Sequence, residues 1–93
     1  MNKKTVYIGI ATDMLHEGHI NILNRGAELG NVIVGLLTDD AIATYKDIPH
    51  YDYENRKILL QNFKQISEII PQESLDYTKN LELIKPDFVV HGD

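Results

Sequence analysis

The sequence contains no cysteine and no tryptophan, and its 9 basic residues are outnumbered by 14 acidic ones. Without cysteine, the chain can form neither a disulfide nor a Cys-based zinc site. The net charge of −5 argues against a nucleic-acid partner, which would need a broad basic face. No apolar run approaches the roughly 20 residues of a membrane-spanning helix, and the first residues lack the pattern of a signal peptide. We therefore expect a cytoplasmic protein that binds neither nucleic acid nor a membrane.

The composition is typical of one soluble globular domain. Hydrophobic residues make up 43% of the chain and charged residues 25%, which predicts a single folded domain over residues 1–93. Four short segments rich in β-branched and apolar residues, 5–11, 31–38, 68–70 and 87–90, predict strands. Because apolar residues follow one another in these strands rather than alternate, both faces of the sheet should be covered.

Four segments with helical periodicity lie between these strands, at residues 19–29, 39–46, 53–66 and 77–84. Strands that alternate with helices imply right-handed crossovers and a parallel sheet. The sequence therefore predicts an α/β fold, a Rossmann-like parallel sheet with helices on both faces.

The helical periodicity also predicts which side chains are buried. In the first helix these are Ile20, Leu23 and Ala27, and Gly30 follows at a position where glycine commonly ends a helix. In the third helix the expected buried side chains recur at three- and four-residue steps, at Leu59, Leu60, Phe63 and Ile66.

The motif with the clearest chemistry follows the first strand, where His16 and His19 bracket the start of a helix. A helix N-terminus presents unpaired backbone N–H groups and the positive end of the helix dipole, which together favour an anion. Gly18 has no side chain to keep a phosphate away from that backbone. Two imidazoles beside such a terminus can donate hydrogen bonds to phosphoryl oxygens as charge builds in an in-line displacement. The pattern predicts an oligophosphate-binding site.

The run from His16 to His19 matches the HxGH signature of the nucleotidyltransferase superfamily, and the chain resembles the cytidylyltransferases within it. The resemblance extends over essentially all 93 residues. Its other elements are Asp13, the run 37–39, Lys46, the run 53–57 and the closing pair 92–93. The chain is most similar to the cytidylyltransferase domains found alongside phosphoenolpyruvate mutase.

This resemblance implies a CTP-dependent reaction. Such enzymes join CTP to a phosphate or phosphonate and release pyrophosphate. The implied acceptor is a small phosphonate or phosphate ester, with 2-aminoethylphosphonate as the first expectation. Mg²⁺ would enter with CTP because it prefers oxygen ligands, whereas no third His or Cys lies near His16 and His19 to complete a zinc site. The resemblance also implies a homodimer.

The resemblance further implies roles for the matching residues. His16, His19 and Lys46 would be catalytic, since the two histidines would contact the CTP phosphates and Lys46 would steady them. Asp13 would lie near the metal or the acceptor, although no direct metal ligand is assigned. The implied nucleotide-binding residues are Ile10, Ala11, Gly18, Arg56, Gly92 and Asp93.

The sequence departs from the family pattern at three places. Residues 10–13 read Ile-Ala-Thr-Asp where relatives often carry Gly-Thr-Phe-Asp. Lys64 replaces an arginine that some glycerol-phosphate enzymes carry. The chain ends at Asp93, before the family's RTxGIST-type motif, so the domain is expected to lack that C-terminal motif.

Simpler interpretations stay open for single residues. Asp13 could brace its loop, and Lys46 could be a surface lysine favoured by a helix dipole. Arg56 could lie on a solvated helix face, His91 at its strand end could be structural, and Asp93 could be a frayed terminal residue.

Other functions also stay open. One is a non-catalytic nucleotide- or phosphate-binding fragment. Another is a cytidylyltransferase for phosphocholine, phosphoethanolamine or glycerol 3-phosphate. A receiver-type signalling domain is disfavoured, because its third strand would end in an acceptor aspartate and here that strand ends in Pro71 and Gln72.

Overall fold

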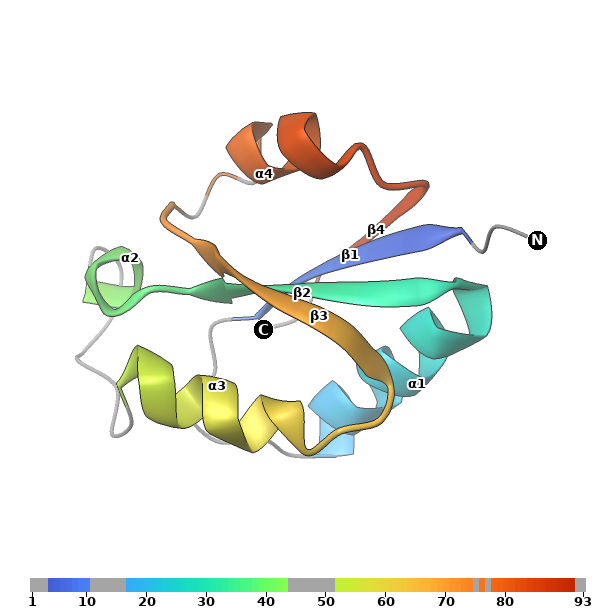
Figure 1. Ribbon diagram of the computed structural model, residues 1–93, viewed down its shortest axis with the longest axis horizontal. Coiled ribbons are helices and arrows are strands. Elements are labelled where there is room, and N and C mark those ends of the chain that lie inside the picture. The colour runs from blue at the N-terminus through green and yellow to red at the C-terminus, as the bar shows by residue number, and fades with distance from the viewer. Residues whose placement is uncertain (1–3, 11–16, 44–51, 75, 77, 92–93) are drawn as a thin grey trace.

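The computed structural model describes residues 4–10, 17–43, 52–74, 76 and 78–91 (Figure 1). The elements, in chain order, are β1 (Thr5–Ile10), α1 (Glu17–Leu29), β2 (Asn31–Leu37), α2 (Asp39–Ala43), α3 (Tyr53–Gln61), β3 (Ile66–Gln72), α4 (Thr78–Ile84) and β4 (Phe88–His91). Strands and helices therefore alternate in the order that the sequence predicts.

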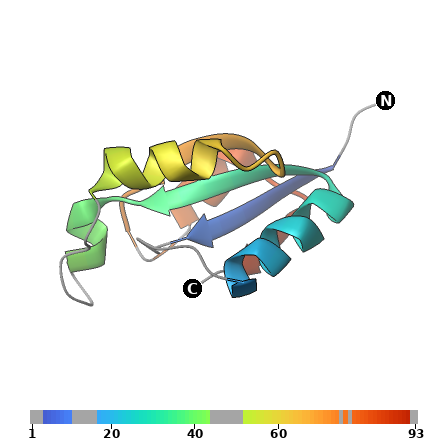
Figure 2. The same cartoon turned by 90° about the horizontal axis from the view of Figure 1, so that it is seen from below.

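The described strands form one four-stranded parallel sheet in the order β3-β2-β1-β4. Figure 1 shows α1 and α3 below the sheet and α4 above it, and Figure 2 shows α1 and α3 from their own side. Successive right-handed crossovers explain this arrangement, because the chain first steps outward from β1 to β3 and then returns past β1 to β4. The prediction of a Rossmann-like parallel sheet with helices on both faces is confirmed.

The main core lies between the sheet and the pair α1 and α3. Its buried members are alternate residues of the two central strands with one leucine from each helix, namely Val6, Ile8, Ile10, Leu23, Val32, Val34, Leu36 and Leu60. Each large aliphatic side chain buried in this way stabilises the fold by roughly 1.5–3 kcal/mol before the loss of conformational entropy.

The third strand is longer than predicted. The sequence indicates only residues 68–70, whereas β3 runs from Ile66 to Gln72 and pairs with β2 over this length. β3 is an edge strand, so its polar residues Ser67 and Glu68 are exposed and Pro71 is tolerated despite its missing N–H group. Ser67 and Pro71 interrupt the apolar pattern on either side of the predicted segment, so the ends of the strand were missed.

The buried face of α1 is rotated from the predicted one. Leu23 is buried as expected, but Ile20 is 37% exposed and Ala27 is also exposed. Gly26 lies at the helix–sheet contact, where an added Cβ would come within 2.9 Å of Ile8 Cδ1. Gly26 is itself buried, so the buried face of α1 runs through Leu23 and Gly26 and leaves Ile20 and Ala27 outside it.

The predicted helix over residues 53–66 is too long. α3 ends at Gln61, after which the backbone N–H of Asn62 donates to the carbonyl oxygen of Leu59 at 3.3 Å and that of Phe63 donates to Leu60 at 3.0 Å. Phe63 then lies in a turn and packs against the core, and Ile66 opens β3. Both residues continue the apolar spacing of the helix, but they are buried by the turn and the strand. Leu59, which was expected to be buried, is 42% exposed.

The α4 face of the sheet is held by polar contacts around Tyr7. The Tyr7 hydroxyl donates to Gln72 Oε1 at 2.5 Å and accepts a hydrogen bond from Asn80 Nδ2 at 2.9 Å. Gly35 makes room for this arrangement, since a Cβ there would lie 1.7 Å from Tyr7 Oη. The backbone oxygen of Gln72 also accepts from Thr38 N at 3.1 Å, which ties the ends of β2 and β3 together.

Candidate active site

The carboxyl ends of the four strands lie at one edge of the sheet, because all of the strands are parallel. Ile10 ends β1, Leu37 ends β2, Gln72 ends β3 and His91 ends β4. In open α/β sheets, ligands bind at this edge. The described helices that begin at this edge are α1, α2, α3 and α4.

α1 places part of the predicted phosphate-binding motif. The helix follows β1 in the chain and begins at Glu17, so Gly18 and His19 belong to its first turn. The backbone N–H groups of a first helical turn lack partners within the helix and carry the positive end of its dipole. The prediction that the motif contains a helix start is confirmed. The structure describes the backbone of His19 but not its side chain.

The other predicted site residues divide into two groups. Ile10 and Arg56 are described, and each is only 1% exposed. Those that lie outside the described residues are Ala11, Asp13, His16, Lys46, Gly92 and Asp93. Their implied roles therefore stay predictions.

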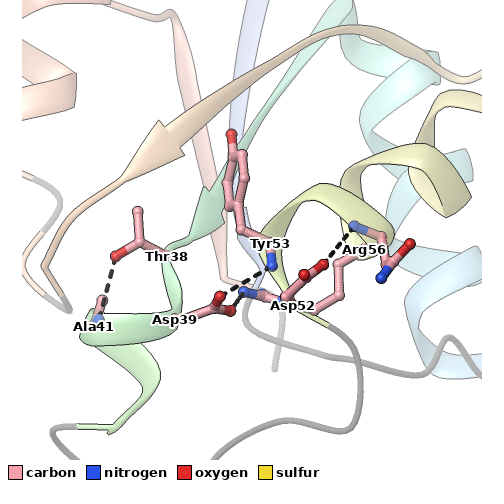
Figure 3. Close-up of polar contacts among 7 residues, drawn as sticks. Thr38, Asp39, Ala41, Asp52, Tyr53 and Arg56 are labelled. Carbon is pink, nitrogen blue, oxygen red and sulfur yellow. Dashed lines mark hydrogen bonds and ion pairs between the residues drawn. The ribbon is translucent and has the colours of Figure 1, made fainter.

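Arg56 is buried and forms an ion pair with Asp39. Its Nη2 donates to Asp39 Oδ1 at 2.8 Å, and the Asp39 side chain is 44% exposed (Figure 3). The other oxygen of the same carboxylate, Oδ2, accepts from the backbone N–H of Tyr53 at 3.3 Å. One aspartate therefore joins the end of β2 to the first turn of α3, and the interpretation of Arg56 as a solvated surface residue is wrong.

Two side chains cap the helices that begin at this edge. Asp52 Oδ1 accepts from Asn55 N at 3.0 Å and starts α3, and Thr38 Oγ1 accepts from Ala41 N at 3.2 Å and starts α2 (Figure 3). Caps of this kind stabilise a helix by about 1 kcal/mol. The sequence placed Asp39 at the start of a helix but predicted no role for it in the site. The available signals were its position directly after a strand and its place in the 37–39 run that the family shares.

The Tyr53 side chain packs against the core, and its hydroxyl is buried with no hydrogen-bond partner among the described residues. Burial raises the pKa of the phenol above its ordinary value, the nearby Glu54 carboxylate adds to this rise, and the Arg56 cation opposes it. The phenol is therefore neutral at physiological pH.

The two described tyrosines should respond in opposite ways to the same substitution. Tyr53→Phe removes a buried hydroxyl that forms no hydrogen bond in the described structure, so the free energy of unfolding should stay constant or rise. Tyr7→Phe removes the hydrogen bonds that the Tyr7 hydroxyl forms with Gln72 Oε1 and Asn80 Nδ2, and it should lower the free energy of unfolding by about 1–3 kcal/mol. Urea unfolding of both variants checks this difference. A larger loss for Tyr53→Phe than for Tyr7→Phe would contradict the assignment of contacts.

The described residues alone do not form a metal site. Among them, no group of three or more His, Cys, Asp or Glu side chains could hold a metal ion. The Asp39 carboxylate is engaged by Arg56 and Tyr53 through its two oxygens. None of the helices in the described part of the chain has the length and hydrophobicity of a membrane span.

A sequence profile described as Cytidylyltransferase-like matches residues 7–93. The chain belongs to the cytidylyltransferase-like family. It is 33% identical over 91 residues to the glycerol-3-phosphate cytidylyltransferase of Bacillus subtilis, covering 97% of this chain and 65% of that protein. It is 36% identical over 85 residues to the ethanolamine-phosphate cytidylyltransferase of Mus musculus, covering 87% of this chain and 20% of that protein.

A solved structure supports the fold of this cytidylyltransferase-like domain. The lipopolysaccharide core biosynthesis protein from Thermoplasma volcanium superimposes with a TM-score of 0.85 at 28% sequence identity. The match covers 92% of this chain and 71% of that one. The chain thus spans just under two thirds of the bacterial relative and a fifth of the mouse relative.

Proposed function

We propose that the protein carrying this chain is a CTP-dependent cytidylyltransferase that transfers CMP to a small phosphonate or phosphate ester and releases pyrophosphate. The observation that carries the proposal is the position of Gly18 and His19 in the first turn of α1, directly after the segment that follows β1. This turn belongs to a domain whose family match spans residues 7–93. The proposed first acceptor is 2-aminoethylphosphonate.

The reaction needs little covalent chemistry from the protein. An oxygen of the acceptor attacks the α-phosphorus of CTP, a new P–O bond forms, and the bond to the β-phosphate breaks. Pyrophosphate leaves with the electron pair of that bond. The attacking oxygen is already anionic at neutral pH, so no general base is required. Catalysis then rests on positioning and on stabilising the charge that builds on the transferred phosphate.

The chain's own residues would supply the positive site that this reaction needs. The backbone N–H groups at the start of α1 face the approach of an anion, and His16 and His19 would donate hydrogen bonds to phosphoryl oxygens. Lys46 would add a full positive charge. Such a local site is required because the whole chain carries a net charge of −5, which by itself repels CTP.

The choice of acceptor rests on the sequence resemblance and on the names of the relatives. The relatives are named for glycerol 3-phosphate and ethanolamine phosphate, which favours a phosphate ester as the second candidate. The resemblance to mutase-associated domains favours the phosphonate. Lys64 is exposed in the turn before β3, at the position where some glycerol-phosphate enzymes carry an arginine. Lysine would offer an acceptor phosphate a point charge, whereas arginine would offer two parallel hydrogen bonds.

A parallel assay of acceptors tests the proposal. The full-length protein is given CTP as its magnesium complex, and pyrophosphate release is followed with 2-aminoethylphosphonate, phosphocholine, phosphoethanolamine and glycerol 3-phosphate. We expect the fastest turnover with 2-aminoethylphosphonate and none when ATP replaces CTP. A clear preference for glycerol 3-phosphate would refute the acceptor, and turnover with ATP alone would refute the nucleotide.

The alternative of a non-catalytic binding module gives a different result. Titration calorimetry would then detect CTP binding by the full-length protein. No pyrophosphate would be released from CTP with any of the four acceptors.

A further inference from the structure

The contacts of Asp39 connect two elements that are distant in the sequence. Its carboxylate accepts from Arg56 Nη2 at 2.8 Å and from Tyr53 N at 3.3 Å, across 17 and 14 residues of chain. Asp39 is the first residue of α2, two positions after the end of β2 at Leu37, and the other two residues lie in the first turn of α3. The Asp39 side chain therefore links the start of α3 to the carboxyl end of β2, in addition to the packing of Leu60 and Tyr53 against the core.

Arg56 is poorly placed for direct contact with a ligand that arrives from solvent. It is only 1% exposed, and its guanidinium lies 6.0 Å from the centre of the Tyr53 ring. A buried guanidinium needs a partner charge, because an uncompensated one is strongly destabilising. Asp39, with a side chain that is 44% exposed, supplies that charge at the boundary between the core and the binding edge.

We propose that Asp39 and Arg56 are a positioning pair for nucleotide binding: they hold the start of α3 against the carboxyl end of β2 and act on CTP through that geometry, without contacting it. The inference rests on the proposed function, since CTP is the ligand whose affinity the pair controls. Small displacements of positioning elements reduce binding and catalysis substantially, so the pair should matter even though Arg56 is covered.

A set of four variants separates positioning from direct contact and from stability. Asp39→Asn and Arg56→Gln each remove one charge of the pair, and a third protein carries both substitutions. Asp52→Ala is the matched control, because Asp52 also fixes the start of α3 but through a contact with Asn55 inside the same helix. For each full-length variant, calorimetry gives the Kd for magnesium-CTP, and urea unfolding followed by circular dichroism gives the midpoint.

We expect Asp39→Asn and Arg56→Gln each to raise the Kd about tenfold at a temperature where the protein is fully folded. The Kd of the double variant should lie within about twofold of the Kd of whichever single variant binds CTP more weakly. This is because the effects of two residues that act as one unit do not add. Asp52→Ala should lower the unfolding midpoint and leave the Kd within about twofold of the parent value. If Arg56→Gln fails to fold, Arg56→Lys replaces it, since lysine keeps the charge but loses the planar fork.

Two outcomes would overturn the inference while leaving the proposed function intact. If Arg56→Gln weakens CTP binding and Asp39→Asn does not, Arg56 contacts the nucleotide directly. If both variants lower the midpoint but keep the parent Kd, the pair is structural alone. Failure of the parent protein to bind CTP would instead overturn the proposed function, and this inference with it.

Discussion

Replacing His16 or His19 by alanine should lower kcat of the full-length protein by about a hundredfold or more, which is typical for the loss of one donor to a transition-state oxyanion. The reason is that charge accumulates on the transferred phosphate, and each imidazole would stabilise it with a hydrogen bond. The backbone of His19 lies in the first turn of α1, next to the unpaired N–H groups of that helix end. Pyrophosphate release at saturating CTP and acceptor measures the effect.

His50 provides the matched control for this experiment, because it lies outside the HxGH motif. His50→Ala should retain turnover within about twofold of the parent rate, as expected for a side chain with no transition-state contact. Near-parental kcat in both His16→Ala and His19→Ala would remove the two histidines from the mechanism.

The second large effect concerns stability. Gly35→Ala should destabilise the fold by about 3 kcal/mol, because overpacking a rigid core site forces neighbours out of place. The added Cβ would lie 1.7 Å from Tyr7 Oη, 2.4 Å from Tyr7 Cζ and 2.8 Å from Gln72 Oε1. Tyr7 is fully buried, and its hydroxyl is hydrogen-bonded to Gln72 and to Asn80 of α4. Neither Tyr7 nor Gln72 can therefore move away freely. Urea unfolding gives the change.

Gly26→Ala is the control for this substitution. The added Cβ would meet the side-chain ends of Ile8 at 2.9 Å and Val32 at 3.1 Å, which can adjust more easily. The better helix propensity of alanine, about 1 kcal/mol, offsets part of that strain. A loss for Gly35→Ala no larger than for Gly26→Ala would show that Tyr7 does not fill the space above Gly35 as described.

Much of the fold follows from local sequence patterns. Apolar segments without alternation indicate strands covered on both faces, and their alternation with helical segments leaves a parallel sheet as the simple solution. The start of α1 within the HxGH motif was also predictable, because the helical spacing of apolar residues begins there. β3 was recognised only in its centre, because an edge strand can carry exposed residues such as Ser67 and Pro71 near its ends.

The errors arise where contacts between elements decide the outcome. Periodicity treats glycine as a neutral position, yet Gly26 is buried at the contact between α1 and the sheet. Phe63 and Ile66 continue the spacing of α3, but they belong to the following turn and strand. The burial of Arg56 was also hidden, because its partner Asp39 lies 17 residues earlier in the chain. Local patterns carry no information about such pairings.

Phosphorus NMR of the full-length protein with magnesium-CTP and each acceptor tests the proposed cytidylyl transfer most directly. We expect the CTP resonances to be replaced by pyrophosphate and by a coupled pair of resonances, which shows the α-phosphorus joined through oxygen to the phosphorus of the acceptor. Pyrophosphate and the new product should form in equal amounts. Unchanged CTP with all four acceptors, or release of CMP with every acceptor left unmodified, would contradict the proposed function.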